Sequence, residues 1–265
     1  MLRPFLSKVG YKLDQYRLLS YRDRSSFVHE KLGTRYGGWH VPVMLLDVAS
    51  ICYCVGAGED ISFDIELINR YGCEVYTFDP TPRASQHIER LKRNTSIGEN
   101  TLVDGDSTQY DANAKVLSHL HFYPYGLWDE RKTMRFYAPK NRDHVSHSLV
   151  NLQKTHEFFE AECRTVKQVM VELSHPAISL LKLDIEGAEY KVLDSLLTDR
   201  IFPRIICVEF DEGHTHQDQK YFERIIQAIL KLKKVGYLAT HFDQWNVTFV
   251  REVESQTSSV AISAV

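Results

Sequence analysis

An apolar run from Leu45 to Val55 ends directly at Gly56, and this junction constrains the fold of the chain more than any other feature. A nearly continuous apolar segment suits a strand whose two faces are both covered by helices. The next segment predicts a helix, because apolar residues recur at helical spacing: Ile61, Ile65 and Ile68. A second strand is expected at Glu74–Phe78. The order strand, helix, strand indicates a parallel sheet with right-handed crossovers.

The same alternation continues along the chain, so we expect an α/β fold with about seven mostly parallel strands and helices on both faces. The further expected strands are His119–Tyr123, Ile178–Leu183, Ile205–Phe210, Tyr237–Phe242 and Val247–Arg251, with an edge piece at 136–137. The last two are expected to pair antiparallel. The first expected helix ends near Gly72. The other expected helices cover Ala84–Arg93, Val166–Leu173, Ala188–Leu197 and Asp218–Lys234. Residues 139–165 look irregular.

The 265 residues are enough for one large α/β domain. Residues 1–40 carry eight Lys or Arg against three Asp or Glu, and we expect them to form a basic, helical arm. This arm is either solvated or in contact with an anionic substrate or membrane surface. Residues 41–252 are expected to form the main domain, and residues 253–265, rich in Ser, a flexible tail.

Composition narrows the class of protein. The net charge of −3 argues against a general nucleic-acid binder. Residues 1–20 contain no apolar run of the length found in a signal sequence. No stretch of the chain approaches the about 20 apolar residues of a membrane span. Four of the five cysteines lie in or beside apolar, strand-like stretches, so we expect reduced, buried thiols in a cytoplasmic protein. The oligomeric state is left open.

Acidic residues follow the expected strands at the edge where ligands of open α/β sheets bind. They include Glu59, Asp60, Asp79, Asp129, Asp184, Glu186, Glu209 and Asp211. Any one of them could cap a helix instead. Acidic residues follow five expected strands in succession, and this repetition favours a binding site over five separate helix caps.

Gly56 and Gly58 let the backbone turn tightly and approach a ligand. The third glycine of a dinucleotide fingerprint is absent, because Ile61 occupies its position. Glu59 and Asp60 in the same loop disfavour a phosphate and favour a cationic cofactor such as S-adenosylmethionine. Asp79 follows Gly58 by 21 positions and is expected to accept hydrogen bonds from ribose hydroxyls, or else to form a turn before Pro80.

Three segments resemble the FkbM-type family of S-adenosylmethionine-dependent methyltransferases. They are VGAGEDISFDIELINRYGCEVYTFDPTPR at 55–83, YGLWDERKTMRFYAP at 125–139, and LLKLDIEGAEYKVLDSLL at 180–197, followed by IICVEFDE at 205–212. The resemblance covers roughly residues 45–212. It implies a Rossmann-like class I methyltransferase fold and O-methylation of hydroxyls on sugars or small natural products.

The resemblance also implies roles for individual residues. Gly56 and Gly58 match the loop that contacts the methionine part of the cofactor, and Asp79 matches the ribose-binding acid. Gly126 and Leu127 match the segment that faces adenine. Asp184 and Glu186 match the motif close to the transferred methyl group.

The chain departs from the family pattern at one place. Many such enzymes have an acid two positions before the first glycine, where this chain has Cys54. We therefore expect Glu59 or Asp60 to contact the cofactor ammonium instead.

A hydroxyl acceptor is a poor nucleophile and needs a base or a metal. The candidate bases are Asp184, Glu186, Glu209 and His147. Asp184, Glu186 and Glu209 could also gather a divalent cation, but a metal is not favoured and no metal ligand is assigned.

Four further features bear on the site. The segment Asn141–Asn151, which contains His147, is either an acceptor loop or a surface loop. His214 and His216 could be zinc ligands, but a zinc site is not favoured because no matching ligand pair is evident. Lys182 is expected to pair with a carboxylate inside the sheet, and Glu189 to lie on a helix surface or cap a helix.

The sequence therefore predicts an S-adenosylmethionine-dependent O-methyltransferase that acts on a small-molecule or sugar acceptor. The alternatives are an N-methyltransferase, a nicotinamide oxidoreductase, and a non-catalytic binding protein that retains the fold. The missing third glycine argues against the oxidoreductase.

Overall fold

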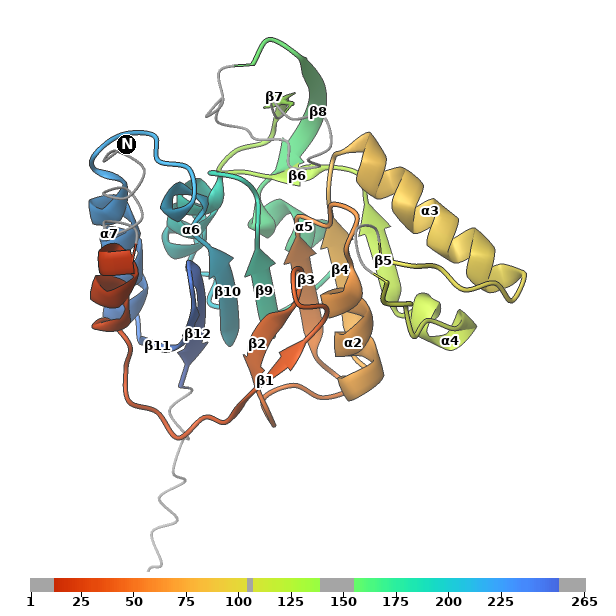
Figure 1. The fold of residues 1–265 in the computed structure, drawn as a ribbon, viewed down its shortest axis with the longest axis horizontal. Helices are drawn as coiled ribbons and strands as arrows, with labels where there is room; N and C mark the ends of the chain where they lie inside the picture. The colour runs from red at the N-terminus through yellow and green to blue at the C-terminus, as the bar shows by residue number, and fades with distance from the viewer. Residues whose placement is uncertain (1–11, 104–106, 139–154, 253–265) are drawn as a thin grey trace, which may run out of the picture.

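The computed structural model describes residues 12–103, 107–138 and 155–252. Its centre is a seven-stranded sheet with the order β11-β12-β10-β9-β3-β4-β5 (Figure 1). Only β12 runs against its neighbours. The strands are β3 Ile51–Val55, β4 Glu74–Phe78, β5 Leu120–Tyr123, β9 Leu180–Leu183, β10 Ile205–Glu209, β11 Tyr237–Asp243 and β12 Asn246–Arg251. The predicted α/β class, the number of strands and the antiparallel pair at the end are confirmed.

The first strand is shorter than predicted. The run Leu45–Val55 is strand only from Ile51 onward. Asp47 turns the chain before it, because its carboxylate accepts hydrogen bonds from the Ala49 amide and the Ser50 hydroxyl. Within β3, Cys52 and Cys54 lie in one core cluster and Tyr53 and Val55 in the other. Helices or other elements therefore cover both faces, as the apolar run predicts.

Two layers sandwich the sheet. The layer on one face includes α2 Ser62–Tyr71, α3 Pro82–Ser96 and α4 Ala114–Ser118, and their apolar side chains share a core with Cys52 and Cys207. The layer on the other face includes α5 Val166–Glu172, α6 Glu189–Asp199 and α7 Tyr221–Lys234, which pack over Tyr53 and Val208. The predicted helices are all confirmed, with shifted ends (Figure 1).

Residues 12–40 are only partly helical, so the expectation of a helical arm is wrong for this part of residues 1–40. Residues 12–19 form a helix that packs on α7, where the Arg17 guanidinium lies 4.4 Å from the centre of the Phe222 ring. Strands β1 His29–Leu32 and β2 Trp39–Pro42 then form an antiparallel hairpin. Trp39 and Val41 are buried against the first face of the main sheet. The hairpin therefore crosses the expected domain boundary at residue 40 and completes one layer of the fold.

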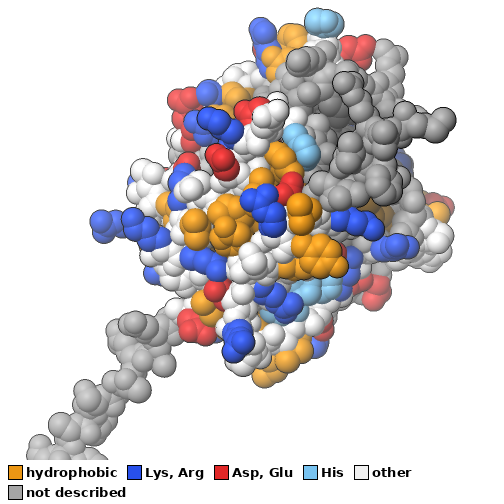
Figure 2. Space-filling model, turned by 60° about the vertical axis from the view of Figure 1, so that its left-hand side comes forward, with side chains coloured by type: hydrophobic (Ala, Val, Ile, Leu, Met, Phe, Trp, Pro, Cys, Tyr) orange, Lys and Arg blue, Asp and Glu red, His pale blue; other side chains and the backbone are white. Residues whose placement is uncertain are grey.

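Basic side chains do not gather into one surface on this side of the molecule. Lys and Arg side chains lie among apolar and acidic ones on the side that carries helix 12–19 and α7 (Figure 2). In the helix 12–19, Arg17 pairs with Asp14 at 2.9 Å. Among the described residues, no helix is long and apolar enough to cross a bilayer.

A second, three-stranded sheet stands beyond the carboxyl ends of the main strands (Figure 1). It consists of β6 Gly126–Leu127, β8 Phe158–Arg164 and β7 Lys132–Tyr137. The prediction that residues 139–165 are irregular is wrong for 158–164, which form its central strand. The expected edge piece at 136–137 belongs to β7 rather than to the main sheet. All five cysteines are buried and free, as predicted.

Candidate cofactor and acceptor site

The glycine loop begins where β3 ends. Gly56 has a left-handed backbone with φ +85°, and its amide donates to the Phe78 carbonyl at 2.9 Å. A Cβ atom on Gly56 would lie 1.8 Å from the carbonyl oxygen of Asp184. No residue with a side chain fits there without a shift of the backbone. Glycine at this position therefore allows the loops after β3 and β9 to meet.

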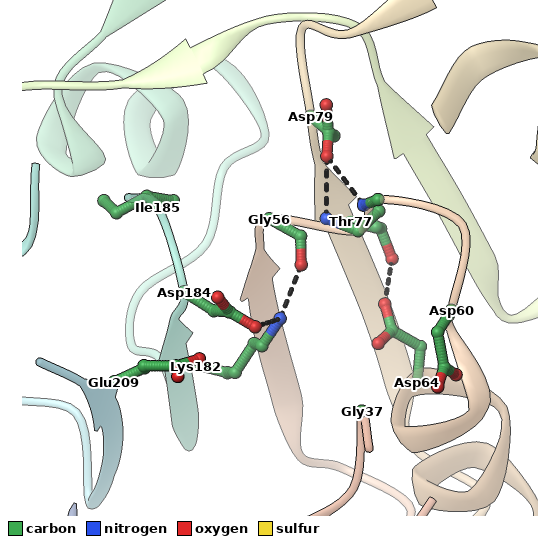
Figure 3. Close-up of polar contacts among 12 residues, drawn as sticks. Gly37, Gly56, Asp60, Asp64, Thr77, Asp79, Lys182, Asp184, Ile185 and Glu209 are labelled. Carbon is green, nitrogen blue, oxygen red and sulfur yellow. Dashed lines mark hydrogen bonds and ion pairs between the residues drawn. The ribbon is translucent and has the colours of Figure 1, made fainter. Parts of the chain in front are cut away.

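Asp79 at the end of β4 holds the glycine loop. Its Oδ2 atom accepts hydrogen bonds from the amides of Ala57 at 2.8 Å and Gly58 at 2.9 Å (Figure 3). Its Oδ1 atom accepts from the Thr81 amide at 2.7 Å. A carboxylate offers about four acceptor positions. Three are therefore used within the protein, and one on Oδ1 is left for a ligand.

The two loop acids expected near a cofactor ammonium have partners inside the protein. Glu59 pairs with Arg83 on α3, with 2.5 Å between its Oε2 atom and Nη2. Asp60 accepts hydrogen bonds from the Thr34 hydroxyl at 2.6 Å and the Ser62 amide at 2.9 Å. Asp60 thus joins the tip of the β1–β2 hairpin to the start of α2.

Lys182 on β9 joins the glycine loop to the segment that follows its own strand. Its ammonium donates to the Gly56 carbonyl at 2.5 Å and lies 3.1 Å from Oδ2 of Asp184 (Figure 3). Lys182 is only 5% exposed. Burial alone would lower its pKa, but the carboxylates of Asp184 and Asp64 raise it above the usual value. The structure thus gives Lys182 the carboxylate partner that the sequence predicts.

Asp184 and Glu209 come together at the carboxyl ends of β9 and β10. The pKa of Glu209 is raised to about 7 by burial and by the neighbouring Asp184. His214 opposes this shift, and its Nε2 atom lies 3.2 Å from Oε1 of Glu209. A carboxylate with a pKa near 7 can take up a proton at neutral pH, which suits a general base.

A second pair of carboxyl groups lies behind this edge. Glu189, at the start of α6, is fully buried and accepts hydrogen bonds from the amides of Ile185 and Gly187. Burial raises its pKa to about 7, and burial together with Glu189 raises that of Asp211 well above the usual value. Glu189 is therefore buried and holds the loop before α6 through the Ile185 and Gly187 amides, so neither the expected helix-surface position nor a side-chain cap of α6 is found. Glu186 lies in the same loop with a left-handed φ of +54°.

Tyr36 was not predicted from the sequence, yet it belongs to this edge. The pKa of its phenol is raised by desolvation from the surrounding protein and by the carboxylates of Asp184 and Glu209, while the side chain remains 87% exposed. The hairpin tip that carries it is fixed by Asp60. A tyrosine beside two glycines, Gly37 and Gly38, was the only sign of a structured tip in the sequence.

The remaining expected residues lie elsewhere. Gly126 and Leu127 are both buried in β6, where a Cβ on Gly126 would lie 2.9 Å from the Cys163 sulfur. His147 and the segment Asn141–Asn151 fall outside the described residues. Within the described part of the chain, no three His, Cys, Asp or Glu side chains are grouped so that they could hold a metal ion.

A family model described as "Methyltransferase FkbM domain" matches residues 53–239 of the chain, which is well over half of its length. The chain belongs to the FkbM methyltransferase family. The FkbM match runs from β3 into β11, so the β1–β2 hairpin and Tyr36 lie outside it.

Two curated relatives are similar to part of this chain. Both are described as "Probable methyltransferase-like protein 24", one from Homo sapiens and one from Rattus norvegicus. Each is 27% identical over 165 residues, which cover 62% of this chain and 32% of the relative. The matched segment thus spans about a third of the length of either relative.

The chain also resembles solved structures at low sequence identity. Methyltransferase FkbM from Methylobacillus flagellatus KT has a TM-score of 0.44 and 12% identity, over 78% of this chain and 45% of that one. Aeropyrum pernix fibrillarin, solved with natively bound S-adenosyl-L-methionine, has a TM-score of 0.36 and 7% identity, over 86% of this chain and 84% of that one.

Proposed function

We propose that this chain is an S-adenosylmethionine-dependent methyltransferase that methylates a hydroxyl of a small molecule or sugar. The observation that carries the proposal is the junction of the glycine loop, Asp79 and Asp184 beside the base-like carboxylate of Glu209. Membership of the FkbM family supports methyl transfer. The order of the strands supports a ligand at this edge, because it lies at the carboxyl ends of β3, β4 and β9.

The groups at this edge fit a phosphate-free, cationic cofactor. The carboxylates of Asp79 and Asp184 border the glycine loop and would repel a pyrophosphate. The free acceptor position on Oδ1 of Asp79 suits one ribose hydroxyl, and the small sheet with Gly126 and Leu127 is the proposed adenine side. Bound here, S-adenosylmethionine supplies an electrophilic methyl group. Alignment of the acceptor with that group is then the main task of the protein.

Glu209 is the proposed base for the acceptor hydroxyl, with Asp184 and Glu186 beside it. A hydroxyl must lose its proton as the new bond forms, and Glu209 can accept that proton near neutral pH. Tyr36 is proposed to contact the acceptor, since it reaches this edge from the hairpin. His147 stays a proposed acceptor residue.

N-methylation is the second candidate, because the same carboxylates would attract a protonated amine. A neutral amine, however, is nucleophilic without a base, so the position of Glu209 favours a hydroxyl. The turnover of the Glu209→Gln variant separates the two: with an amine acceptor the variant keeps its turnover, whereas with a hydroxyl acceptor it loses it.

The deciding experiment is titration calorimetry with S-adenosylmethionine, S-adenosylhomocysteine and NAD. Micromolar binding of the first two compounds and none of NAD is the expected result. Binding of NAD instead would identify a nicotinamide oxidoreductase, and binding of none would favour a non-catalytic protein. A chelator tests the divalent metal, which we do not favour: full methyl transfer in its presence excludes the metal.

The proposed partners are limited to the acceptor. We propose neither nucleic acid nor a membrane span, and a cytoplasmic location is supported by the five free thiols, which persist in a reducing compartment.

A further inference from the structure

A buried polar row crosses the first face of the main sheet just below the glycine loop. The strand registers place Cys207, Lys182, Cys54 and Thr77 side by side on β10, β9, β3 and β4. Each of these residues is at most 5% exposed. A cation at this depth needs a nearby counter-charge, because transfer of an unpaired charge from water into the interior is costly.

Asp64 of α2 lies over this row. It is 3% exposed, and the Thr77 hydroxyl donates to its Oδ1 atom at 2.5 Å (Figure 3). In the register, Thr77 and Lys182 lie on either side of Cys54. The Asp64 carboxylate also interacts electrostatically with the Lys182 ammonium, which lowers the Asp64 pKa. From the hairpin, the centre of the Trp39 ring lies 5.9 Å from Lys182 Nζ.

Lys182 thus lies between two carboxylates, one on each side. Asp184 is 30% exposed at the edge of the sheet, whereas Asp64 is buried behind it. If Asp64 were neutral, Asp184 alone would balance the ammonium, and less negative potential would reach the ligand side. The charge of Asp64 therefore leaves the Asp184 carboxylate free to act on a cation at the edge.

We propose that Asp64 is a positioning residue of the cofactor site, which holds Lys182 on the Gly56 carbonyl and preserves the negative potential of Asp184 toward a sulfonium. This inference rests on the proposed function, and it concerns a residue that contacts neither cofactor nor acceptor. It predicts that loss of the Asp64 charge affects the binding of S-adenosylmethionine and S-adenosylhomocysteine differently. S-Adenosylmethionine carries a sulfonium charge that S-adenosylhomocysteine lacks, so loss of the Asp64 charge should weaken binding of the first compound more.

Protonation of Asp64 should have the same effect as its substitution. Burial raises the pKa of Asp64 to about 6, against the opposing effects of Lys182 and the Thr77 hydroxyl. Asp60 raises it further, and Cys52 and Cys54 are the other titratable groups that interact with Asp64. The preference for the charged cofactor should therefore decline as the pH falls through about 6.

The test compares Asp64→Asn with a variant that moves the charge, Cys54→Asp/Asp64→Asn. Cys54 lies beside Lys182 in the register, so an acid there faces the same ammonium. Asp23→Asn is the matched control, since it removes a carboxylate that pairs with Lys233 at 2.9 Å far from the glycine loop. Calorimetry measures the affinities for S-adenosylmethionine and S-adenosylhomocysteine, and circular dichroism verifies folding.

Asp64→Asn should lower the affinity for S-adenosylmethionine about tenfold and that for S-adenosylhomocysteine about threefold or less, as expected for a charge acting at several ångströms. The double variant should regain most of the difference, and Asp23→Asn should show none. Equal loss for both compounds, or no recovery in a folded double variant, would overturn the inference.

If Asp64→Asn does not fold, the Glu209→Gln variant decides, because it removes the other carboxylate at this edge that titrates in the same range. In that variant, a ratio of the two affinities that stays constant from neutral pH to below the Asp64 pKa overturns the inference, and a decline through about 6 supports it. Wild-type protein that binds neither compound contradicts the proposed function and this inference with it.

Discussion

The Lys182 ammonium lies 2.5 Å from the Gly56 carbonyl oxygen and 3.1 Å from Oδ2 of Asp184. One buried cation thereby joins the loop after β3 to the loop after β9. These two loops flank the carboxyl edge of adjacent parallel strands, where a ligand binds in this type of sheet. The geometry of the site therefore depends on a charge that belongs to the core.

Lys182→Met should destabilise the protein strongly. Methionine fills a similar volume but leaves Asp64 and Asp184 without their cation. Removal of one member of a buried ion pair costs about 3–5 kcal/mol. Urea unfolding would measure the loss. Lys167→Met is the control, because Lys167 pairs with Asp199 at the surface and its loss should cost about 1 kcal/mol or less. Equal losses for the two variants would contradict a buried role for Lys182.

Gly56→Ala should prevent the loops after β3 and β9 from meeting. The new Cβ would lie 1.8 Å from the Asp184 carbonyl oxygen, and the φ of +85° adds backbone strain. We expect a loss of more than about 4 kcal/mol, or no folded protein. Gly98→Ala separates the two causes. Gly98 has a φ of +76° but no atom within 4 Å of its Cβ position, so strain alone should cost about 1–2 kcal/mol. Thermal unfolding of both variants would show whether the clash dominates.

The central strands could be predicted from the sequence because the apolar pattern and the glycines at the ends of the elements both indicate them. Glu74–Phe78 is predicted to the residue, and α2 ends at Gly72 as expected. The turn before β3 could not be predicted, since its residues are as apolar as the strand and Asp47 is its only marker. The β1–β2 hairpin was missed because two four-residue strands among many basic residues give little periodic signal.

The candidate site was predicted in part, for reasons that lie in side-chain partners. The position of Asp79, Asp184 and Glu209 at one edge follows from the strand order. The partners of Glu59 and Asp60 do not, because Arg83 and Thr34 reach them from other elements. The sequence does carry a signal for Asp64. It lies on the apolar face of its helix, between Ile61 and Ile68, where a carboxylate requires an explanation.

Asp79→Ala should weaken binding of S-adenosylhomocysteine by about 1–3 kcal/mol, the scale of hydrogen bonds to a charged group. The amides of Ala57 and Gly58 would lose their shared acceptor, so the loop should also become more mobile. Calorimetry measures the affinity, and hydrogen exchange at the two amides measures the loop. Unchanged affinity with faster exchange would limit Asp79 to loop support and contradict contact with the ribose.

Glu209→Gln should remove the acid limb of the pH profile of methyl transfer. Glu209 must be ionised to accept a proton, so turnover by the wild-type protein should fall as the pH falls through about 7. The glutamine variant should show low turnover, by about 10²–10⁴-fold, without that step, and its affinity for S-adenosylhomocysteine should change little. A variant that keeps both turnover and the acid limb would assign the base to another residue.

The same variant has a second, independent readout in stability. The folded-state pKa of Glu209 is raised from 4.5 to about 7, so the folded protein binds this proton more tightly than the unfolded chain. The stability that the proton contributes is complete below 4.5 and is lost as the pH rises through about 7. The free energy of unfolding should therefore decline with pH over this window more steeply in the wild type than in Glu209→Gln. Urea unfolding at several pH values would compare the two, and parallel curves would contradict the raised pKa on which the role of Glu209 as base depends.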